Sequence, residues 1–397
     1  MSGKIPVLEG IRVIDFTKAI AGPLCGAYLA DMGAEVIKIE SVGGDPSRKS
    51  SPKVGEFSGY FTNCNRGKKS MDIDLKSPEG KEAFTRLVKT ADVLLENNRP
   101  GVMDRLGFGY EDCKKLNPKL IYCSSSGFGQ TGPYAHRPAY DLAAQAMGGV
   151  MNITGTPETV PLNPGPAVAD VMTAQNNTIA ILLSLFGREK TGLGQHIDNS
   201  LLEAAVASQL AQSPEYLIDG IIPTRQGSRF NNACPYEAYK AKDGYFVFAA
   251  IGGWKTFCEN IIERPDLMTD ERFMDSGIRM KHREDLRKII EDWAADKTVA
   301  EIVESRAHML PCAPVNNFEQ VYNDEHIREH REMFIEIPLA DGNRMTITNN
   351  PIKMSEFRCR PEKGPSLPGG DNEDLLTELG FDTATIADWR SRSIISG

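Results

Sequence analysis

Residues 11–40 read IRVIDFTKAIAGPLCGAYLADMGAEVIKIE and decide the fold class of the chain. Residues 11–16 are rich in β-branched and apolar types, residues 23–32 place their apolar side chains at helical spacing, and residues 34–40 form a second apolar run. A strand, a helix and a strand in this order are typical of two parallel strands joined by a crossover helix. The stretch therefore predicts the first unit of an α/β domain.

The same alternation continues through the first 125 residues. A helix is expected over residues 77–90, because Ser77 is a capping residue and Pro78 follows it in the first turn. Further strands are expected over residues 91–96 and 120–125, and residues 168–188 predict a long and largely buried helix. Strands that alternate with helices predict a parallel sheet covered on both faces.

The pattern changes after residue 224. Residues 236–251 alternate like a hairpin that turns at residues 242–244, and helices are expected at about 254–262, 283–294 and 298–307. Another hairpin is expected to turn at residues 341–343. We therefore expect a large domain in residues 1–224 and a smaller α+β lobe in residues 225–325.

The composition excludes several classes of protein. Of the 397 residues, 41% are hydrophobic and 25% are charged, and no apolar run approaches the roughly 18–20 residues of a membrane span. The net charge of −9 argues against a general nucleic-acid binder. The eight cysteines contain no CxxC pair, and the first twenty residues do not read as an export signal. We expect a cytoplasmic protein with no membrane or nucleic-acid partner.

Two sequence motifs have simpler interpretations than the chemistry they first indicate. Gly127–Gly132 matches the G-x-G-x-x-G pattern of dinucleotide sites, but a proline-containing segment, residues 133–138, follows where a helix would have to begin. His326-Ile-Arg-Glu329-His330 matches an inverted zinc-protease pattern without an evident third ligand. The latter segment is densely charged, so we interpret it as a solvated helix face and expect no metal.

Other residues point to an anionic ligand and a nucleophile. Basic side chains cluster at loop-like positions beside the predicted strands; they are Arg66, Lys68, Lys69, Arg99 and Arg105. In an acidic chain such clusters suit a phosphate-bearing ligand, with a solvated turn as the alternative for each residue. Asp170 lies among small and apolar residues at the start of the long helix. It would either cap that helix or act as a nucleophilic carboxylate.

Taken together, these segments resemble the class III coenzyme A-transferases of the CaiB/BaiF type, the family of formyl-CoA and carnitine CoA-transferases. The matching motifs stand in the family's order and cover almost the whole chain; they are residues 8–16, 21–23, 31–40, 44–46, 65–70, 96–101, 105–107, 126–133, 166–173 and 191–204. The resemblance implies a large Rossmann-like α/β domain to which residues 326–397 return. It also implies an interlocked homodimer.

The resemblance places the catalytic aspartate of the family at Asp170. This residue would attack the thioester of an acyl-CoA, giving a mixed anhydride and then an aspartyl-CoA thioester, from which CoA passes to an acceptor acid. CoA would be a substrate, with no permanently bound cofactor and no metal. The implied CoA-binding residues come from several loops; they are Ile20, Ala21, Arg66, Lys68, Lys69, Asp74, Leu75, Asn97, Asn98, Arg99, Arg105, Arg137 and Tyr140. Backbone N–H groups at Gly252 and Gly253 would be oxyanion donors.

Two alternatives and one open question accompany this interpretation. The α-methylacyl-CoA racemases share the fold and the aspartate but need a histidine; this chain has Ala139-Tyr140-Asp141 at the matching place, with His136 four residues before Tyr140. A noncatalytic CoA-binding protein would not need Asp170. The resemblance leaves the identity of the donor and acceptor acids open. Ile20 replaces the glutamine of formyl-CoA transferases, which argues against oxalate and formate as the natural pair. A dicarboxylate, a hydroxy acid, a carnitine-like acid or a sterol acid could be the acceptor. Among these we expect a small dicarboxylate or hydroxy acid, with succinyl-CoA or acetyl-CoA as donor.

Overall fold

The computed structural model describes residues 4–396. Its contacts divide the chain into two compact units. The first comprises Met1–Val150, Pro164–Gln209 and Glu325–Gly397, and the second comprises Met151–Asn163 and Leu210–Asp324. The first unit is therefore built from both ends of the chain, and residues 210–224 belong to the second unit, outside the large domain in which we expected them.

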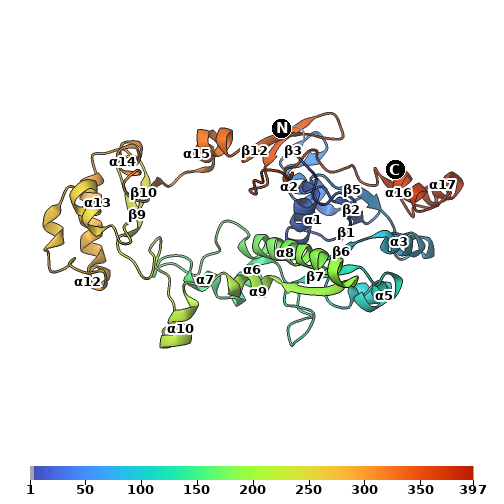
Figure 1. The fold of residues 1–397 in the computed structure, drawn as a ribbon, viewed down its shortest axis with the longest axis horizontal. Coiled ribbons are helices and arrows are strands. Elements are labelled where there is room, and N and C mark those ends of the chain that lie inside the picture. The colour runs from blue at the N-terminus through green and yellow to red at the C-terminus, as the bar shows by residue number, and fades with distance from the viewer. Residues whose placement is uncertain (1–3, 397) are drawn as a thin grey trace. The chain divides into compact units, whose positions relative to one another are not determined.

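Six parallel strands form the central sheet of the first unit (Figure 1). In spatial order they are β5 (Lys69–Asp72), β2 (Glu35–Glu40), β1 (Arg12–Phe16), β6 (Val93–Glu96), β7 (Ile121–Ser126) and β8 (Gln195–Ser200). The chain thus adds β2 and β5 on one side of β1 and then β6, β7 and β8 on the other side, so the strand order reverses between β1 and β6. The parallel sheet expected from the sequence is confirmed, and the crevice beyond the ends of β1 and β6 is the place where such sheets bind ligands.

Alternate side chains of the strands face opposite layers of helices. Ile14, Ile37 and Leu94 share a core cluster with Phe84 of α3 (Pro78–Thr90) and with side chains of α16 (Asn372–Glu378) and α17 (Thr383–Ser391). Ser77 caps α3 as expected, accepting the N–H of Gly80 at 2.9 Å. The last helices of the chain therefore complete the core around its first strands.

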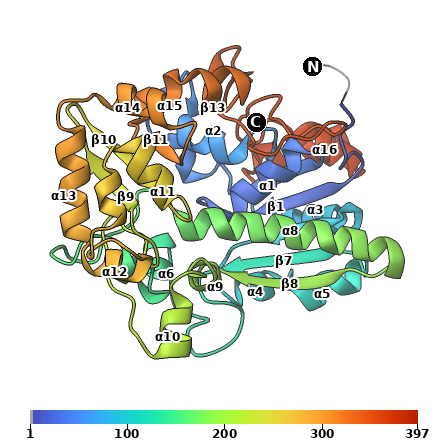
Figure 2. The same ribbon diagram turned by 60° about the vertical axis from the view of Figure 1, so that its left-hand side comes forward.

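The opposite face of the sheet is covered by α1 (Ala21–Asp31) and α8 (Val168–Thr191), which lie side by side (Figure 2). Cys25 and Leu29 of α1 and Ile181 of α8 share a core cluster with Val13 and Val93 of the strands. The 24-residue α8 is the long helix expected from the sequence, and it ends at Gly192 in the left-handed conformation. Both faces of the sheet are thus covered, as the strand–helix alternation predicts.

Shorter elements complete the first unit. The helices are α2 (Gly59–Asn65), α4 (Val102–Leu106), α5 (Tyr110–Leu116), α6 (Asp141–Met147), α7 (Val150–Ile153), which reaches the second unit, and α9 (Leu201–Ala207). The hairpin expected around residues 341–343 is confirmed as β12 (Phe334–Pro338) and β13 (Arg344–Thr348). A small ladder, β3 (Lys53–Val54) with β4 (Phe57–Ser58), and the turns η1 (Pro46–Lys49) and η4 (His326–His330) lie between these elements.

The second unit contains a three-stranded antiparallel sheet of β11 (Cys312–Pro314), β10 (Tyr245–Ala249) and β9 (Tyr236–Lys240). The expected β9–β10 hairpin is confirmed. Its helical elements are α10 (Ser213–Asp219), α11 (Trp254–Thr256), η2 (Phe257–Ile261), η3 (Pro265–Met268), α12 (Ser276–Lys281), α13 (Arg283–Ala294), α14 (Val299–Arg306) and α15 (Phe318–Asn323). Phe246, Phe248, Leu286 and Ile290 form its own apolar core, so this unit is an α+β lobe.

All eight cysteines are free thiols, and seven of them are buried. Burial raises the pKa of Cys25 and Cys113 to about 12, which keeps these thiols protonated and unreactive. Between residues 4 and 396, no helix combines the length and apolar character needed to cross a membrane.

Candidate active site

A cavity of about 240 Å³ opens in the first unit, where β1, β6 and β7 end. The loop after β1, the loop after β6 and the segment between β7 and α6 contribute most of its wall, and α8 contributes Asp170. Its lining residues are Lys18, Ala19, Ala21, Asn97, Asn98, Arg99, Pro100, Ser125, Ser126, Gly127, Ala135, Arg137, Pro138, Ala139, Tyr140, Asp170 and Leu201. The cavity therefore occupies the crevice at which the strand order reverses.

Asp170 is the buried carboxylate of this cavity, with 9% of its surface exposed. It is the third residue of α8, and Ala167 takes the N-cap position without a side-chain hydrogen bond. The side chain of Asp170 accepts a hydrogen bond from the backbone N–H of Ala21, at the start of α1. The capping alternative is therefore wrong for the Asp170 side chain, which faces the ligand cavity and the N-terminus of another helix.

A second carboxylate, Asp141, lies beside the nucleophile candidate. Asp141 Oδ1 accepts the backbone N–H of Asp170 at 3.1 Å, and the amide of the fully buried Gln145 donates to Asp141. Burial, followed by the negative charge of Asp141, raises the pKa of Asp170 to about 7, against the opposing hydrogen bond from Ala21. Near neutral pH, Asp170 is thus present in both its ionised and its protonated form, as suits an acid–base or nucleophilic role.

The cavity also holds three exposed cations, Lys18, Arg99 and Arg137. Within residues 4–396 none of them is paired with a carboxylate, although the Arg137 guanidinium lies 4.1 Å from the centre of the Tyr134 ring. Unpaired cations at the mouth of a cavity attract anionic ligands such as phosphates. Lys18 is absent from the cluster that the sequence singled out because it stands alone in its loop.

Hydrogen bonds fix the loops that carry these cations. The backbone N–H of Lys18 donates to Asn97 Oδ1 at 2.8 Å, and Asn97 Nδ2 donates to the Lys18 carbonyl at 2.7 Å. The N–H of Asn98 donates to the buried Glu96 carboxylate at 2.8 Å. Strand β6 and the loop after β1 thus hold Arg99 and Lys18 on the same cavity.

The structure brings together seven of the residues predicted for the site: Ala21, Asn97, Asn98, Arg99, Arg137, Tyr140 and Asp170. Four others lie outside the cavity wall. Ile20 is the N-cap residue of α1, Asp74 and Leu75 follow β5, and Arg105 is exposed on α4. Gly252 and Gly253 belong to the second unit, in the turn between β10 and α11, where Gly252 has a φ of +71°.

Arg66, Lys68 and Lys69 do not present their charges to the cavity. Arg66 Nη2 lies 2.7 Å from Asp31, Lys68 Nζ lies 2.5 Å from Asp15, and Lys69 is paired with Glu35. Arg66 and Lys68 are 3% and 1% exposed, respectively. The loop position that suggested phosphate binding is thus the site of buried ion pairs, and we do not assign Arg66 or Lys68 to the ligand site.

The remaining sequence motifs lie apart from this chemistry. His136 is exposed and does not line the cavity, and no histidine occurs among the lining residues. His326–His330 forms a π-helical turn in which His330 faces Glu325 at 3.6 Å, and residues 4–396 contain no cluster of three metal-binding side chains. No helix begins directly after the glycines at 127–132, since α6 starts at Asp141.

Tyr60 is a further residue that sequence reasoning missed. It lies in the first turn of α2, and burial, followed by the charges of Cys64 and Asp170, raises its pKa to about 12. Its phenol therefore stays protonated at neutral pH within the electrostatic influence of the nucleophile candidate. No local pattern distinguishes Tyr60 from an ordinary helical tyrosine, because its relation to Asp170 exists only in the fold.

The family model described as CoA-transferase family III matches residues 8–372. The chain belongs to this family. It is 42% identical to succinyl-CoA:mesaconate CoA-transferase of Haloarcula hispanica over 95% of this chain and 98% of that protein. It is 37% identical to succinate–glutarate CoA-transferase of Agrobacterium fabrum, over 96% and 97%. A solved CaiB/BaiF family protein from Brucella suis aligns with a TM-score of 0.83 and 35% identity, over 94% of this chain and 99% of that one. The protein is thus a CoA-transferase.

Proposed function

We propose that this CoA-transferase moves CoA from succinyl-CoA to a small dicarboxylic acid, and that Asp170 carries CoA as an aspartyl thioester. The observation that supports the proposal most directly is the placement of Asp170: a buried carboxylate with a pKa of about 7 in a cavity that also contains three unpaired cations. The named donor or acceptor acids of several relatives are succinate, mesaconate, glutarate and malate, which are all small dicarboxylates.

The reaction consists of four acyl exchanges at Asp170. The ionised carboxylate of Asp170 attacks the thioester carbonyl of the donor. The C–S bond breaks, CoA leaves as a thiolate, and a mixed anhydride between Asp170 and the donor acyl group remains. The thiolate then attacks the aspartyl carbonyl, releasing the donor acid and leaving aspartyl-CoA. The acceptor carboxylate displaces the thiolate to form a second anhydride, and the thiolate attacks the acceptor acyl group to regenerate Asp170. No proton, water or electron is consumed, and CoA is a substrate throughout.

The backbone N–H of Ala21 stabilises negative charge at the aspartyl group. It donates to the Asp170 carboxylate in the free enzyme and is oriented by the N-terminus of α1, so it also faces the oxyanion that forms when the thiolate attacks the aspartyl carbonyl. Lys18, Arg99 and Arg137 bind the phosphates of CoA.

The outer face of α8 supports a homodimer, which we propose to be interlocked. Ile179, Leu183 and Phe186 follow one another at helical spacing and are 56%, 65% and 63% exposed in the single chain. A continuous apolar stripe on a helix of the main domain is typical of an interface between subunits. The eight free thiols suit a reducing compartment, and we place the enzyme in the cytoplasm.

The racemase alternative lacks its second proton-transfer group in the cavity, because His136 is exposed and is not among the lining residues.

One experiment separates the transferase reaction from the racemase reaction. The enzyme is incubated with succinyl-CoA and hydroxylamine, digested and analysed by mass spectrometry. Transfer predicts a hydroxamate on the Asp170 peptide, about 15 Da heavier, because hydroxylamine cleaves aspartyl anhydrides and thioesters.

Asp170→Asn is the matched control and should show no mass shift. A binding protein without catalysis would give no hydroxamate with either form. Loss of α-deuterium from a branched acyl-CoA without any hydroxamate would show the racemase reaction and contradict the proposal.

A further inference from the structure

The loop between β1 and α1 carries the N–H group that contacts Asp170, and it contains a strained residue. Ala19 has a φ of +65°, in the left-handed region that non-glycine residues seldom occupy. Such a conformation persists only when neighbouring groups hold the chain in place. Ala21, whose N–H donates to Asp170, lies two residues further along. The surroundings of this loop therefore control the geometry at the nucleophile.

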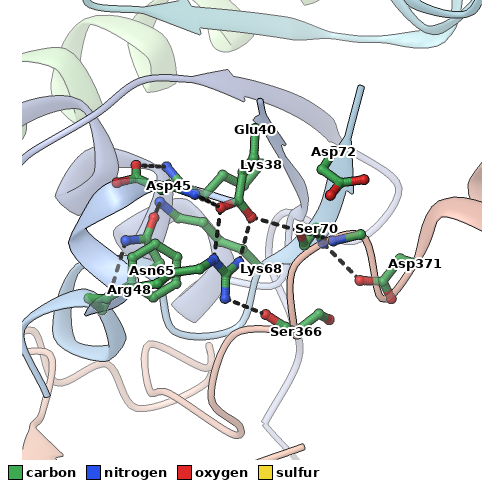
Figure 3. A network of polar contacts seen from close by, with 12 residues as sticks. Lys38, Glu40, Asp45, Arg48, Asn65, Lys68, Ser70, Asp72, Ser366 and Asp371 are labelled. Atoms are coloured by element: carbon green, nitrogen blue, oxygen red, sulfur yellow. Dashed lines mark hydrogen bonds and ion pairs between the residues drawn. The ribbon is translucent and has the colours of Figure 1, made fainter. Parts of the chain in front are cut away.

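Two buried lysines hold the loop on both sides of Ala19. Lys38 Nζ, on β2, donates to the carbonyl of Thr17 at 2.9 Å. Lys68 Nζ, beside β5, donates to the carbonyl of Pro23 at 2.7 Å. Each lysine is only 1% exposed. Figure 3 shows that both lie inside a network of polar contacts. The two ammonium groups thus bind the chain just before and just after the strained segment.

Carboxylates neutralise both lysines, and one of the two also binds the same loop. Asp15 lies 2.5 Å from Lys68 Nζ and also accepts the backbone N–H of Thr17 at 3.1 Å and its hydroxyl. Asp45 lies 3.4 Å from Lys38 Nζ, but it contacts Ser47 rather than the loop. Burying an ammonium group costs desolvation free energy, which an ion pair alone often does not offset. The bonds of both lysines to backbone carbonyls therefore indicate that they also hold the loop in place.

We propose that Lys38 and Lys68 are positioning residues for the transferase reaction: they clamp the carbonyls of Thr17 and Pro23 so that the Ala21 N–H points at the Asp170 carboxylate. The inference rests on the proposed function of Asp170 as the nucleophile. Loosening the clamp weakens the hydrogen bond to ionised Asp170. Because that bond lowers the pKa of Asp170, its loss raises the pH at which the nucleophile becomes available.

Two variants separate positioning from simple charge pairing. Lys38→Met breaks the ion pair with Asp45 and also removes the donor to the Thr17 carbonyl. Asp45→Asn breaks the same ion pair but leaves Lys38 bonded to Thr17. The groups whose charges interact with Asp170 are Asp141 on α6 and Tyr60 and Cys64 on α2, and the cations that line the same cavity are Lys18, Arg99 and Arg137. All of them are unchanged in both variants.

The measurement is kcat with succinyl-CoA from about pH 5 to about pH 9, under saturating substrates. The acid limb is the part of the profile in which kcat rises with pH as the nucleophile ionises. We expect the midpoint of this limb to move up by about one pH unit in Lys38→Met, and to stay within about 0.2 pH units of the wild type in Asp45→Asn. An unmoved limb in Lys38→Met, or an equal shift in both variants, would overturn the clamp. If the wild-type enzyme formed no Asp170 hydroxamate, both the proposed function and this inference would be wrong. If the hydroxamate formed normally but the acid limb of Lys38→Met did not move, only the positioning role of the lysines would be wrong.

A glycine at position 19 keeps the test decisive if Lys38→Met does not fold. Glycine adopts a φ of +65° without strain, so Ala19→Gly should raise the thermal stability of the Lys38→Met protein. Glycine does not restore the contact to Thr17. The acid limb of the Lys38→Met, Ala19→Gly enzyme should therefore still lie about one pH unit above that of Ala19→Gly. Equal limbs in this pair would overturn the proposal.

Discussion

Replacing Asp170 by asparagine should stabilise the free enzyme while it abolishes turnover, and the gain should depend on pH. Folding raises the pKa of Asp170 from 3.8 to about 7, chiefly through burial and then through Asp141. A raised pKa means that the folded state favours the protonated group. The ionised form therefore opposes folding above pH 7, and this penalty disappears below the unfolded value of 3.8.

The size of the effect follows from the shift of about 3 pH units. At about 1.4 kcal/mol for each unit, ionised Asp170 destabilises the fold by roughly 4 kcal/mol at pH 8. Asparagine carries no charge and keeps an oxygen that accepts the Ala21 N–H. For 397 residues, an unfolding entropy on the order of 0.8 kcal/mol/K converts this energy to a Tm increase of roughly 5 °C.

The assay is differential scanning calorimetry of the CoA-free wild-type and Asp170→Asn enzymes at several pH values. The difference in Tm should be near zero at pH 4, grow from there to about pH 7, and level off above it. Asp45→Asn is a control of opposite sign: burial raises the pKa of Asp45, but Lys38 and Ser47 outweigh it and lower the pKa below 3.8. This variant should therefore be less stable than the wild type above about pH 4, by a nearly constant amount, and the difference should shrink only at lower pH. A gain for Asp170→Asn that is independent of pH, or a loss at pH 8, would refute the assignment of a raised pKa.

Three further outcomes test the site and the assembly. Asp141→Asn should shift the acid limb of kcat down by about half to one pH unit, because the negative charge of Asp141 raises the pKa of Asp170; an upward shift would contradict this electrostatic relation. Arg99→Ala and Arg137→Ala should each raise KM for succinyl-CoA about tenfold with a smaller change in kcat, as expected for phosphate contacts; unchanged KM values would exclude these residues from the CoA site. Leu183→Asp should prevent the proposed interlocked dimer from assembling, so that the purified protein sediments as a monomer, because it places a charge in the apolar stripe of α8; a dimer obtained as readily as from the wild type would show that the stripe is not the interface.

Local sequence patterns predict the sheet because they are properties of neighbouring residues. The apolar runs at 11–16 and 34–40 become β1 and β2, and the helical spacing between them becomes α1. Asp170 could be singled out because it is a carboxylate in an apolar context at a helix start. These features depend on burial and periodicity, which the composition of a short window already reflects.

The functions of Arg66 and Lys68 could not be predicted in this way. Their carboxylate partners, Asp31 and Asp15, lie 35 and 53 residues earlier in the chain. The packing of α1 against α2 brings Asp31 to Arg66, and the sheet order β5-β2-β1 brings Asp15 near Lys68. A basic loop therefore looks the same in sequence whether its cations face a phosphate or a buried acid. For the same reason Asp141 could be recognised beside Asp170 only once α6 and α8 were placed in contact.

The raised pKa of Asp170 reflects two opposing demands on one carboxylate. In the proposed reaction, the anhydride and thioester intermediates have to be shielded from water, which requires a buried site, and burial is the largest factor that raises the pKa of Asp170. Attack on a thioester requires the ionised form, which burial disfavours. The Ala21 N–H resolves part of this conflict, because it stabilises the charge without admitting water. A backbone donor held by a strained loop and two buried lysines is therefore consistent with a site that must keep its nucleophile both dry and ionised.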